Sequence, residues 1–309
     1  MSDIDHHELF KRPGISPTSI NAFSESPSRF WKTSSYNPNR EKKEATDAMI
    51  FGRLVHCLVL TPEVFEKEFA IQPEKTNQLD TVSEIKAALK SAGISAPSSA
   101  NKPQLEGVVR ANLQCVELWS DTIENFRASA GEREVIKKDM YNEAKKMQDA
   151  MFANPAVKSL LGNGMSEEPF CWFPDGPDGL MKKCRLDYCR NGLVIEYKTD
   201  LFPSMETFKK TIALRGYHRQ TSFQMDAAEL KYGKRPDGAI IIAQDKEFHD
   251  DIAIYALSAE ALSIGAQENQ KVFEKIKERM KRNDWRTFPQ KIQEIDLPRW
   301  YKPANIIGE

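Results

Sequence analysis

The sequence lacks any long apolar run. No segment approaches the roughly 18 uninterrupted apolar residues that a helix needs to cross a bilayer. The N-terminal stretch MSDIDHHELFKRPG also lacks the apolar centre of a signal peptide. Hydrophobic residues make up 40% and charged residues 29% of the 309 residues, a composition typical of globular proteins. We therefore expect a cytoplasmic protein that does not contact membranes.

Cysteine is scarce, and its spacing forms no pattern. The five cysteines are scattered and include no C-x-x-C pair: Cys57, Cys115, Cys171, Cys184 and Cys189. Neither a structural zinc site nor a disulfide framework is indicated, and we expect reduced thiols.

An excess of charge of one sign is also absent. The 44 lysines and arginines nearly balance the 45 aspartates and glutamates, which leaves a net charge of −1. This balance argues against a protein that coats nucleic acid through bulk charge. It leaves open a protein in which an acidic metal site offsets a basic groove.

Helices are expected to dominate the first half of the chain, residues 1–155. Ser16 before Pro17 is typical of a helix start, and residues 45–60 carry apolar residues on one helical face. Further helices are expected near 104–120 and 139–152. Residues 73–104 are rich in Ser, Pro and Lys around a short helix at 82–89, which indicates a flexible insertion.

Strand patterns appear in the following part, residues 156–282. The expected strands are 170–173, 180–189, 193–199, 239–243 and 252–255, and the expected helices are 204–213, 217–232 and 258–281. The tail, residues 283–309, holds two tryptophans and three prolines. This order indicates an α/β (α+β) fold with a mixed central sheet flanked by helices, in a single domain of 1–309.

The dipeptide Asn191-Gly192 lies between two strand patterns and predicts a tight β-hairpin. Counting back from a two-residue turn places Asp187 opposite Glu196. Side chains alternate along a strand, so Lys198 shares the face of Glu196 while Tyr197 points the other way.

Two facing carboxylates repel one another, and a divalent cation between them reverses this cost. With Lys198 alongside to orient water or to stabilise charge, the patch suits the hydrolysis of a phosphodiester. The alternative is a solvated face on which Asp187 and Glu196 pair with nearby lysines and arginines.

His56 lies four residues after Gly52, on the same face of the 45–60 helix. It is a candidate metal ligand or phosphate contact, or else a histidine satisfied within the core or surface. Gly52 in a helix interior costs ~1 kcal/mol relative to alanine. We therefore expect another segment to approach the helix closely there.

Gln220 lies near the start of the 217–232 helix. Arg215, His218 and Arg219 give this helix start a positive character, which is typical of a phosphate seat. The alternative is a solvated polar helix start. On the strand before the hairpin, either Glu167 or Glu168 is a further candidate ligand, and the spacing leaves open which of them, if either, faces the site.

Five short elements of the chain, in order, match a known arrangement of motifs. They are Ser26-Pro27-Ser28-Arg29-Phe30; Phe51-Gly52 through His56; the strand pair Cys184 to Asp187 and Ile195 to Thr199; Tyr217-His218 with Gln220; and Asp296-Leu297-Pro298-Arg299-Trp300. Together they resemble the RecB-type branch of the PD-(D/E)xK nucleases, and within it the exonuclease VIII (RecE-type) exonucleases of prophages. The resemblance covers most of the chain and implies a restriction-endonuclease-like fold.

The resemblance also implies a role for each matched residue. Asp187 and Glu196 would bind Mg²⁺ or Mn²⁺, with the backbone carbonyl of Tyr197 as a further ligand. His56 would lie at or beside the metal. The matching acid on the preceding strand aligns better with Glu167 than with Glu168.

Lys198 would activate the water, and Gln220 would position the DNA or the site. The expected DNA contacts are Arg53, Arg185, Arg215, His218 and Arg219. Two positions depart from the motifs without loss of chemistry, Leu186 in place of proline and Glu196 in place of aspartate. Gln224 stands where many relatives have tyrosine. Ser26 replaces the cysteine that some relatives use for an iron–sulfur cluster, so no cluster is expected.

The function implied is a Mg²⁺-dependent exonuclease that degrades linear double-stranded DNA, 5′ to 3′. It would leave 3′ single-stranded tails for a RecT-like single-strand annealing recombinase and would enclose DNA as a ring-shaped homo-oligomer. One alternative is another nuclease of the same fold that acts on single strands or cuts internally. The other is a catalytically silent DNA-binding assembly protein.

Overall fold

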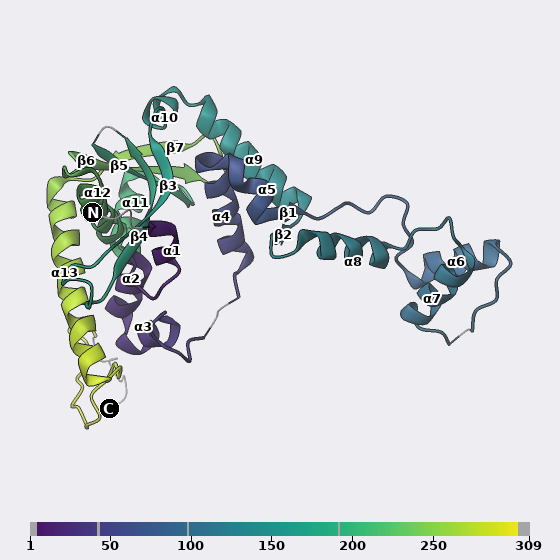
Figure 1. Cartoon of the computed structure of the whole chain (residues 1–309), viewed down its shortest axis with the longest axis horizontal. Coiled ribbons are helices and arrows are strands. Elements are labelled where there is room, and N and C mark those ends of the chain that lie inside the picture. Colours follow the sequence, from purple (N-terminus) through teal and green to yellow (C-terminus); the bar gives the residue numbers. More distant parts are fainter. Residues whose placement is uncertain (1–4, 42–43, 98, 191, 302–309) are drawn as a thin grey trace, which may run out of the picture.

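A five-stranded mixed sheet forms the centre of the fold (Figure 1). The computed structural model describes residues 5–41, 44–97, 99–190 and 192–301. The strands lie in the order β3 (Met165–Trp172), β4 (Lys182–Arg190), β5 (Leu193–Asp200), β6 (Gly238–Asp245) and β7 (Ile252–Ala256). β5 and β6 are parallel and the other neighbours are antiparallel. The predicted mixed sheet is confirmed.

Helices cover both faces of this sheet. One face packs against α2 (Pro17–Glu25), α3 (Pro27–Thr33), α12 (Tyr217–Tyr232) and α13 (Ala259–Arg282). The other face packs against α4 (Asp47–Leu60) and α9 (Lys138–Ala153). The remaining elements near the sheet are α1 (His6–Phe10), η1 (Pro62–Val64), α5 (Phe65–Glu68), α10 (Pro155–Leu160) and α11 (Met205–Arg215). Alternation along β5 joins the two cores, because Val194 packs in the first and Ile195 in the second.

Several helix starts follow local chemistry and confirm the predictions. The Ser16 hydroxyl accepts a hydrogen bond from the Ser19 N–H, and Pro17 occupies the first turn of α2. Ser258 caps α13 in the same way. The predicted helix at 104–120 is wrong, because the structure has two helices there, α7 (Lys102–Asn112) and α8 (Trp119–Ala130).

The segment between the two helices is held by a distant contact. Leu118 forms an isolated parallel bridge with Leu79, through hydrogen bonds from the Leu79 N–H to the Glu117 carbonyl and from the Trp119 N–H to the Leu79 carbonyl, both 2.9 Å. Residues 79–118 therefore begin and end at adjacent backbone positions. In the sequence they lie between β1 (Phe69–Ile71) and β2 (Glu134–Ile136), which pair in parallel.

Residues 79–118, which we call the distal module, form a small unit of their own. It contains α6 (Val82–Ser91) and α7, and Figure 1 shows it projecting beyond α8, away from the sheet. Its core is made of Ile85, Leu89, Leu105, Val109 and Leu118. The stretch 73–104, expected to be a flexible insertion, therefore contributes a helix and packed side chains.

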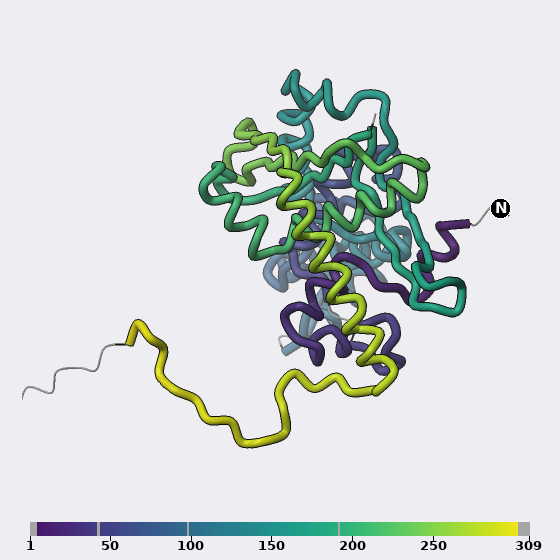
Figure 2. The backbone as a smooth tube through the Cα atoms, turned by 90° about the vertical axis from the view of Figure 1, so that its left-hand side faces the viewer, coloured from purple at the N-terminus to yellow at the C-terminus, as the bar shows by residue number. Residues whose placement is uncertain are grey.

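The tail after α13 lacks helices and strands in its described part, residues 283–301, and residues 302–309 lie outside the described residues. Figure 2 shows it leading away from the rest of the molecule. Among the described residues, no single helix is long and apolar enough to cross a membrane. Only α4 together with residues Pro62–Glu68, bent by 119°, meets that length and composition. The apolar side chains from Leu54 to Leu60 of α4 are buried in the second core.

Candidate active site

The site lies where the β4–β5 hairpin opens. The pairs Arg190 with Leu193, Cys189 with Val194 and Tyr188 with Ile195 confirm the predicted register, while Asn191 in the turn lies outside the described residues. The pairing ends one step before Asp187 and Glu196. There the Asp187 carboxylate accepts a hydrogen bond of 3.1 Å from the Tyr197 N–H instead. The two acids therefore sit at a fork between strands rather than within the ladder.

Glu167 interrupts the neighbouring strand. Its φ is +51°, in the left-handed region that non-glycine residues rarely adopt. The β3–β4 pairs continue on either side of it, Ser166 with Tyr188 and Glu168 with Leu186. Such backbone strain costs ~1–3 kcal/mol and concentrates at functional sites. Here it sits on the residue whose carboxylate faces the fork.

The parity left open by the sequence is now resolved. The Glu167 Oε1 lies 3.9 Å from the His56 Nδ1 and so joins the fork. Glu168 instead pairs with Lys231 of α12, and the structure does not bring it to the site. Of the two candidate ligands, only Glu167 is in position.

Three side chains from three elements converge beside the fork. They are His56 of α4, Glu167 of β3 and Asp187 of β4, and each offers one ligand atom within 4.8 Å of the others. The His56 Nδ1 lies 3.8 Å from the Asp187 Oδ2. Burial lowers the pKa of His56, but the two carboxylates outweigh it and leave the pKa raised. This donor set can hold a divalent cation, with one imidazole and two carboxylates leaving room for water or phosphate oxygens.

Gly52 lies one turn before His56 on α4. In the part of the chain that the structure describes, no heavy atom outside the neighbouring residues of α4 lies within 4 Å of the position that a Cβ on Gly52 would take. The expectation that another segment of the protein approaches Gly52 is therefore wrong. The glycine instead faces open space on the side of the helix that carries His56.

Glu196 lies next to this cluster, and its carboxylate is held at both oxygens. Lys198 Nζ and Gln220 Nε2 both contact Oε1, and Gln224 Nε2 donates to Oε2 at 2.6 Å. The side chain is fully buried. Burial and then the charge of Asp187 raise the pKa of Glu196 to about 7. The structure thus places Glu196 beside the cluster of three ligands rather than within it.

Lys198 is a cation at neutral pH. Burial alone would lower its pKa, but the carboxylates of Glu196 and Asp187 raise it far above the usual range. Lys198 can therefore donate hydrogen bonds and stabilise negative charge. Tyr197 points to the other face, as predicted, where it is buried and its ring lies 5.0 Å from the ring of His56.

Gln224 is a member of the site to which the sequence analysis assigned no role. Besides the Glu196 carboxylate it donates to the Arg185 carbonyl at 3.3 Å, which ties α12 to β4. Helical spacing could have identified it, because Gln224 follows Gln220 by one turn on the same face of α12.

The predicted DNA contacts divide into two groups. Arg53 pairs with Glu134, Arg185 lies 3.6 Å from Glu167, and Arg215 is exposed. The structure places these three on open surface.

The other two predicted contacts lie within the fold. His218 and Arg219 both reach Glu268 of α13, at 3.1 and 3.2 Å, and Arg219 also donates to Asn21 of α2. Their side chains are only 12% and 18% exposed. At the predicted phosphate-binding site, His218 and Arg219 instead join α12 to α2 and α13. Because both basic side chains already pair with Glu268, they are not available to bind a phosphate.

Carboxylates, a histidine and a cationic lysine at the open end of a hairpin, on a mixed sheet between helical layers, define a nuclease of the PD-(D/E)xK type. The sequence matches the PDDEXK-like domain of unknown function (DUF3799) over residues 16–298, and the chain belongs to this family. Among curated proteins, none matches the sequence.

Solved structures agree on the fold. The chain is similar to a candidate exonuclease from Eubacterium rectale with a TM-score of 0.51 and 12% sequence identity. The match covers 92% of this chain and 86% of that chain. An identity this low shows a shared fold alone; together with the PDDEXK-like family match, it confirms the predicted restriction-endonuclease-like architecture.

Proposed function

We propose that the chain is a Mg²⁺-dependent exodeoxyribonuclease that degrades linear double-stranded DNA from its ends, 5′ to 3′. The observation that carries this proposal is the meeting of His56, Glu167 and Asp187 beside a buried Glu196–Lys198 pair. The similarity to a candidate exonuclease favours attack at ends. The 3′ tails would serve a RecT-like annealing protein, and a ring-shaped homo-oligomer would hold the duplex. The 5′-to-3′ polarity, this partner and the ring rest on the family resemblance of the sequence.

In this proposal, His56, Glu167 and Asp187 would hold the cation, and the family resemblance adds the backbone carbonyl of Tyr197 as a further ligand. Mg²⁺, with Mn²⁺ as a substitute, would supply Lewis-acid activation of the phosphate and of water. Carboxylates gathered in this way repel one another, and a divalent charge among them offsets that repulsion.

The chain's own residues would do the rest. Lys198, held as an ammonium group by Glu196, donates to the reacting phosphate or to the attacking water and stabilises the developing negative charge. Gln220 and Gln224 fix the Glu196 carboxylate, so the position of the Lys198 Nζ is set by α12. Arg185 lies beside Glu167 with its side chain half exposed, and in this proposal it would contact a phosphate of the DNA next to the one that is cleaved.

A linear duplex labelled at one 5′ end, compared with a closed circle of the same sequence, tests the proposal. We expect Mg²⁺-dependent release of label from the linear duplex and no loss of the circle. Release from single strands alone, or nicking of the circle, would assign the chain to another activity of the same fold. Binding without cleavage would leave a silent assembly protein.

The role of Lys198 is tested by Lys198→Ala, for which we expect cleavage to fall by about 100-fold or more. Lys231→Ala is the matched control, because Lys231 also pairs with a strand carboxylate, Glu168, but away from the site. Circular dichroism of both variants checks the fold. Equal cleavage by the two variants would contradict the mechanism.

A further inference from the structure

The distal module stands apart from the catalytic body and has its own core. Every residue of its apolar cluster comes from residues 79–118, and the sheet contributes none. Leu79 and Leu118 close its base. Helix α8 separates the module from β2 and from the rest of the fold, and its 12 residues span ~18 Å. A folded unit held at this distance contributes nothing to the geometry of His56 and Glu196, so its role lies elsewhere.

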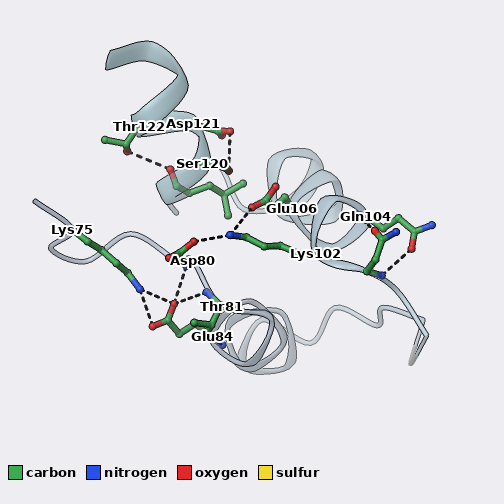
Figure 3. Close-up of polar contacts among 12 residues, drawn as sticks. Lys75, Asp80, Thr81, Glu84, Lys102, Gln104, Glu106, Ser120, Asp121 and Thr122 are labelled. Atoms are coloured by element: carbon green, nitrogen blue, oxygen red, sulfur yellow. Dashed lines mark hydrogen bonds and ion pairs between the residues drawn. The ribbon is translucent and has the colours of Figure 1, made fainter. Parts of the chain in front are cut away.

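Charge is distributed unevenly within the module. Two acids of the module lie at its base and are engaged there: Glu84 with Lys75 at 2.9 Å, and Asp80 with Lys102 at 2.6 Å (Figure 3). Hydrogen bonds from the Thr81 N–H, Lys75 and the Asp80 N–H lower the pKa of Glu84 to about 2. Residues 85–101 contain no aspartate or glutamate and two lysines, Lys86 and Lys90. The base is thus acidic and self-compensated, and the outer part is basic.

The basic part surrounds a groove. Lys86 and Lys90 lie one turn apart on α6, both are exposed, and both line a groove of about 540 Å³ together with Gly93, Ile94 and Ser95. Ser91 at the end of α6 and Ser99 in the following loop are also exposed and add hydroxyl groups. Lysine ammonium groups and hydroxyl groups are donors that proteins direct at phosphate oxygens.

We propose that the surface formed by Lys86 and Lys90 of α6 with Ser95 and Ser99 of the following loop binds the sugar–phosphate backbone of duplex DNA at a distance from the active site. The proposal rests on the proposed function for its substrate. A protein partner is disfavoured because protein interfaces have an apolar, aromatic centre. Among the module's described residues, Val82 alone is a clearly exposed large apolar side chain, at 38%. The contact would be independent of sequence, because it reads phosphates and not base edges.

The test measures the binding of a labelled duplex of about 30 base pairs, ~100 Å long, by fluorescence anisotropy in EDTA over a range of salt. Each phosphate contact contributes about 0.9 to the slope of log affinity against log salt. The double variant Lys86→Glu with Lys90→Glu should therefore reduce the steepness of this slope by about 2. We also expect at least a ~10-fold loss of affinity for the duplex near 0.1 M salt.

The matched control reverses two lysines of the same spacing elsewhere. Lys271→Glu with Lys275→Glu lies on α13, where both side chains are exposed one turn apart. This control should leave the slope and the affinity within twofold of the unchanged protein. Metal-dependent hydrolysis of bis(p-nitrophenyl) phosphate, too small to reach the module, should be the same in both double variants.

Equal DNA affinity and salt slope in the two double variants would overturn the proposal. A change in self-association of the Lys86/Lys90 variant, measured by sedimentation with DNA binding intact, would overturn it in favour of a protein contact. Failure of the proposed function is recognised separately, as the absence of metal-dependent hydrolysis of bis(p-nitrophenyl) phosphate by the unchanged protein.

Discussion

Replacing Gly52 with alanine is expected to stabilise the fold and to slow DNA cleavage at the same time. A glycine in a helix interior is ~1 kcal/mol less favourable than alanine. Because no heavy atom of the described residues beyond the neighbouring turns of α4 lies within 4 Å of the added Cβ, no clash offsets this gain. For a chain of this size, ~1 kcal/mol raises the midpoint of thermal unfolding by about 2 °C.

Activity should change in the opposite direction. The open space at Gly52 lies on the face of α4 that carries His56, so a DNA strand bound at the cluster would pass over it. We expect Gly52→Ala to raise the KM for duplex DNA, and Gly52→Leu to raise it further with a similar gain in stability. Thermal unfolding and steady-state cleavage with Mg²⁺ measure the two effects.

Gly107 of α7 provides the control, since it is also a helix-interior glycine with open space at its Cβ position. Gly107→Ala should leave the KM unchanged. A less stable Gly52→Ala protein would refute the account of the helix. A Gly52→Leu protein with an unchanged KM would refute the use of that space by substrate.

Three further outcomes follow from the site. The raised pKa of Glu196, about 7, means that the folded state binds its proton more tightly than the unfolded state. In EDTA the midpoint of thermal unfolding should therefore fall as the pH rises from 5 to 8, and added Mg²⁺ should restore it. A midpoint that rises over that pH range would contradict this reasoning. Glu167→Gly should keep or raise stability by ~1 kcal/mol, because glycine tolerates the left-handed backbone, yet weaken Mn²⁺ binding at least ~10-fold by calorimetry; unchanged affinity would remove Glu167 from the cluster. Gln224→Leu removes a hydrogen-bond donor to the Glu196 carboxylate, which should lower the stability of the fold by ~1–3 kcal/mol. Because that hydrogen bond lowers the pKa of Glu196, its loss should shift the acid limb of the pH–rate profile to higher pH. An acid limb at the same pH would mean that Gln224 only packs.

The hairpin could be predicted because its determinants are local. The Asn191-Gly192 turn and strand alternation fix which residues face each other, and the structure has the predicted pairs up to Tyr188 with Ile195. The faces of Glu196, Lys198 and Tyr197 follow from the same rule. Local chemistry also determines the starts of α2 and α13.

What could not be predicted depends on distant contacts. Alternation assumes an unbroken strand, so it could not place Glu167, whose left-handed backbone turns its carboxylate into the fork. Charge patterns could not show that Arg219 pairs with Glu268, 49 residues further along the chain. Helical periodicity could not show that Leu118 bridges to Leu79, or that α8 begins only after it, at Trp119. Each of these outcomes belongs to the assembled fold.

The bridge between Leu79 and Leu118 has a consequence for how such a protein can change. Because the chain departs and comes back at adjacent backbone positions, about forty residues can be shortened, enlarged or exchanged while the ends to be joined stay side by side. Neither the sheet nor His56, Asp187 or Glu196 would need to adjust. Natural variation could therefore alter how far along its substrate the enzyme reaches without touching the bond-breaking chemistry, and an engineer could do so by grafting at the same two leucines.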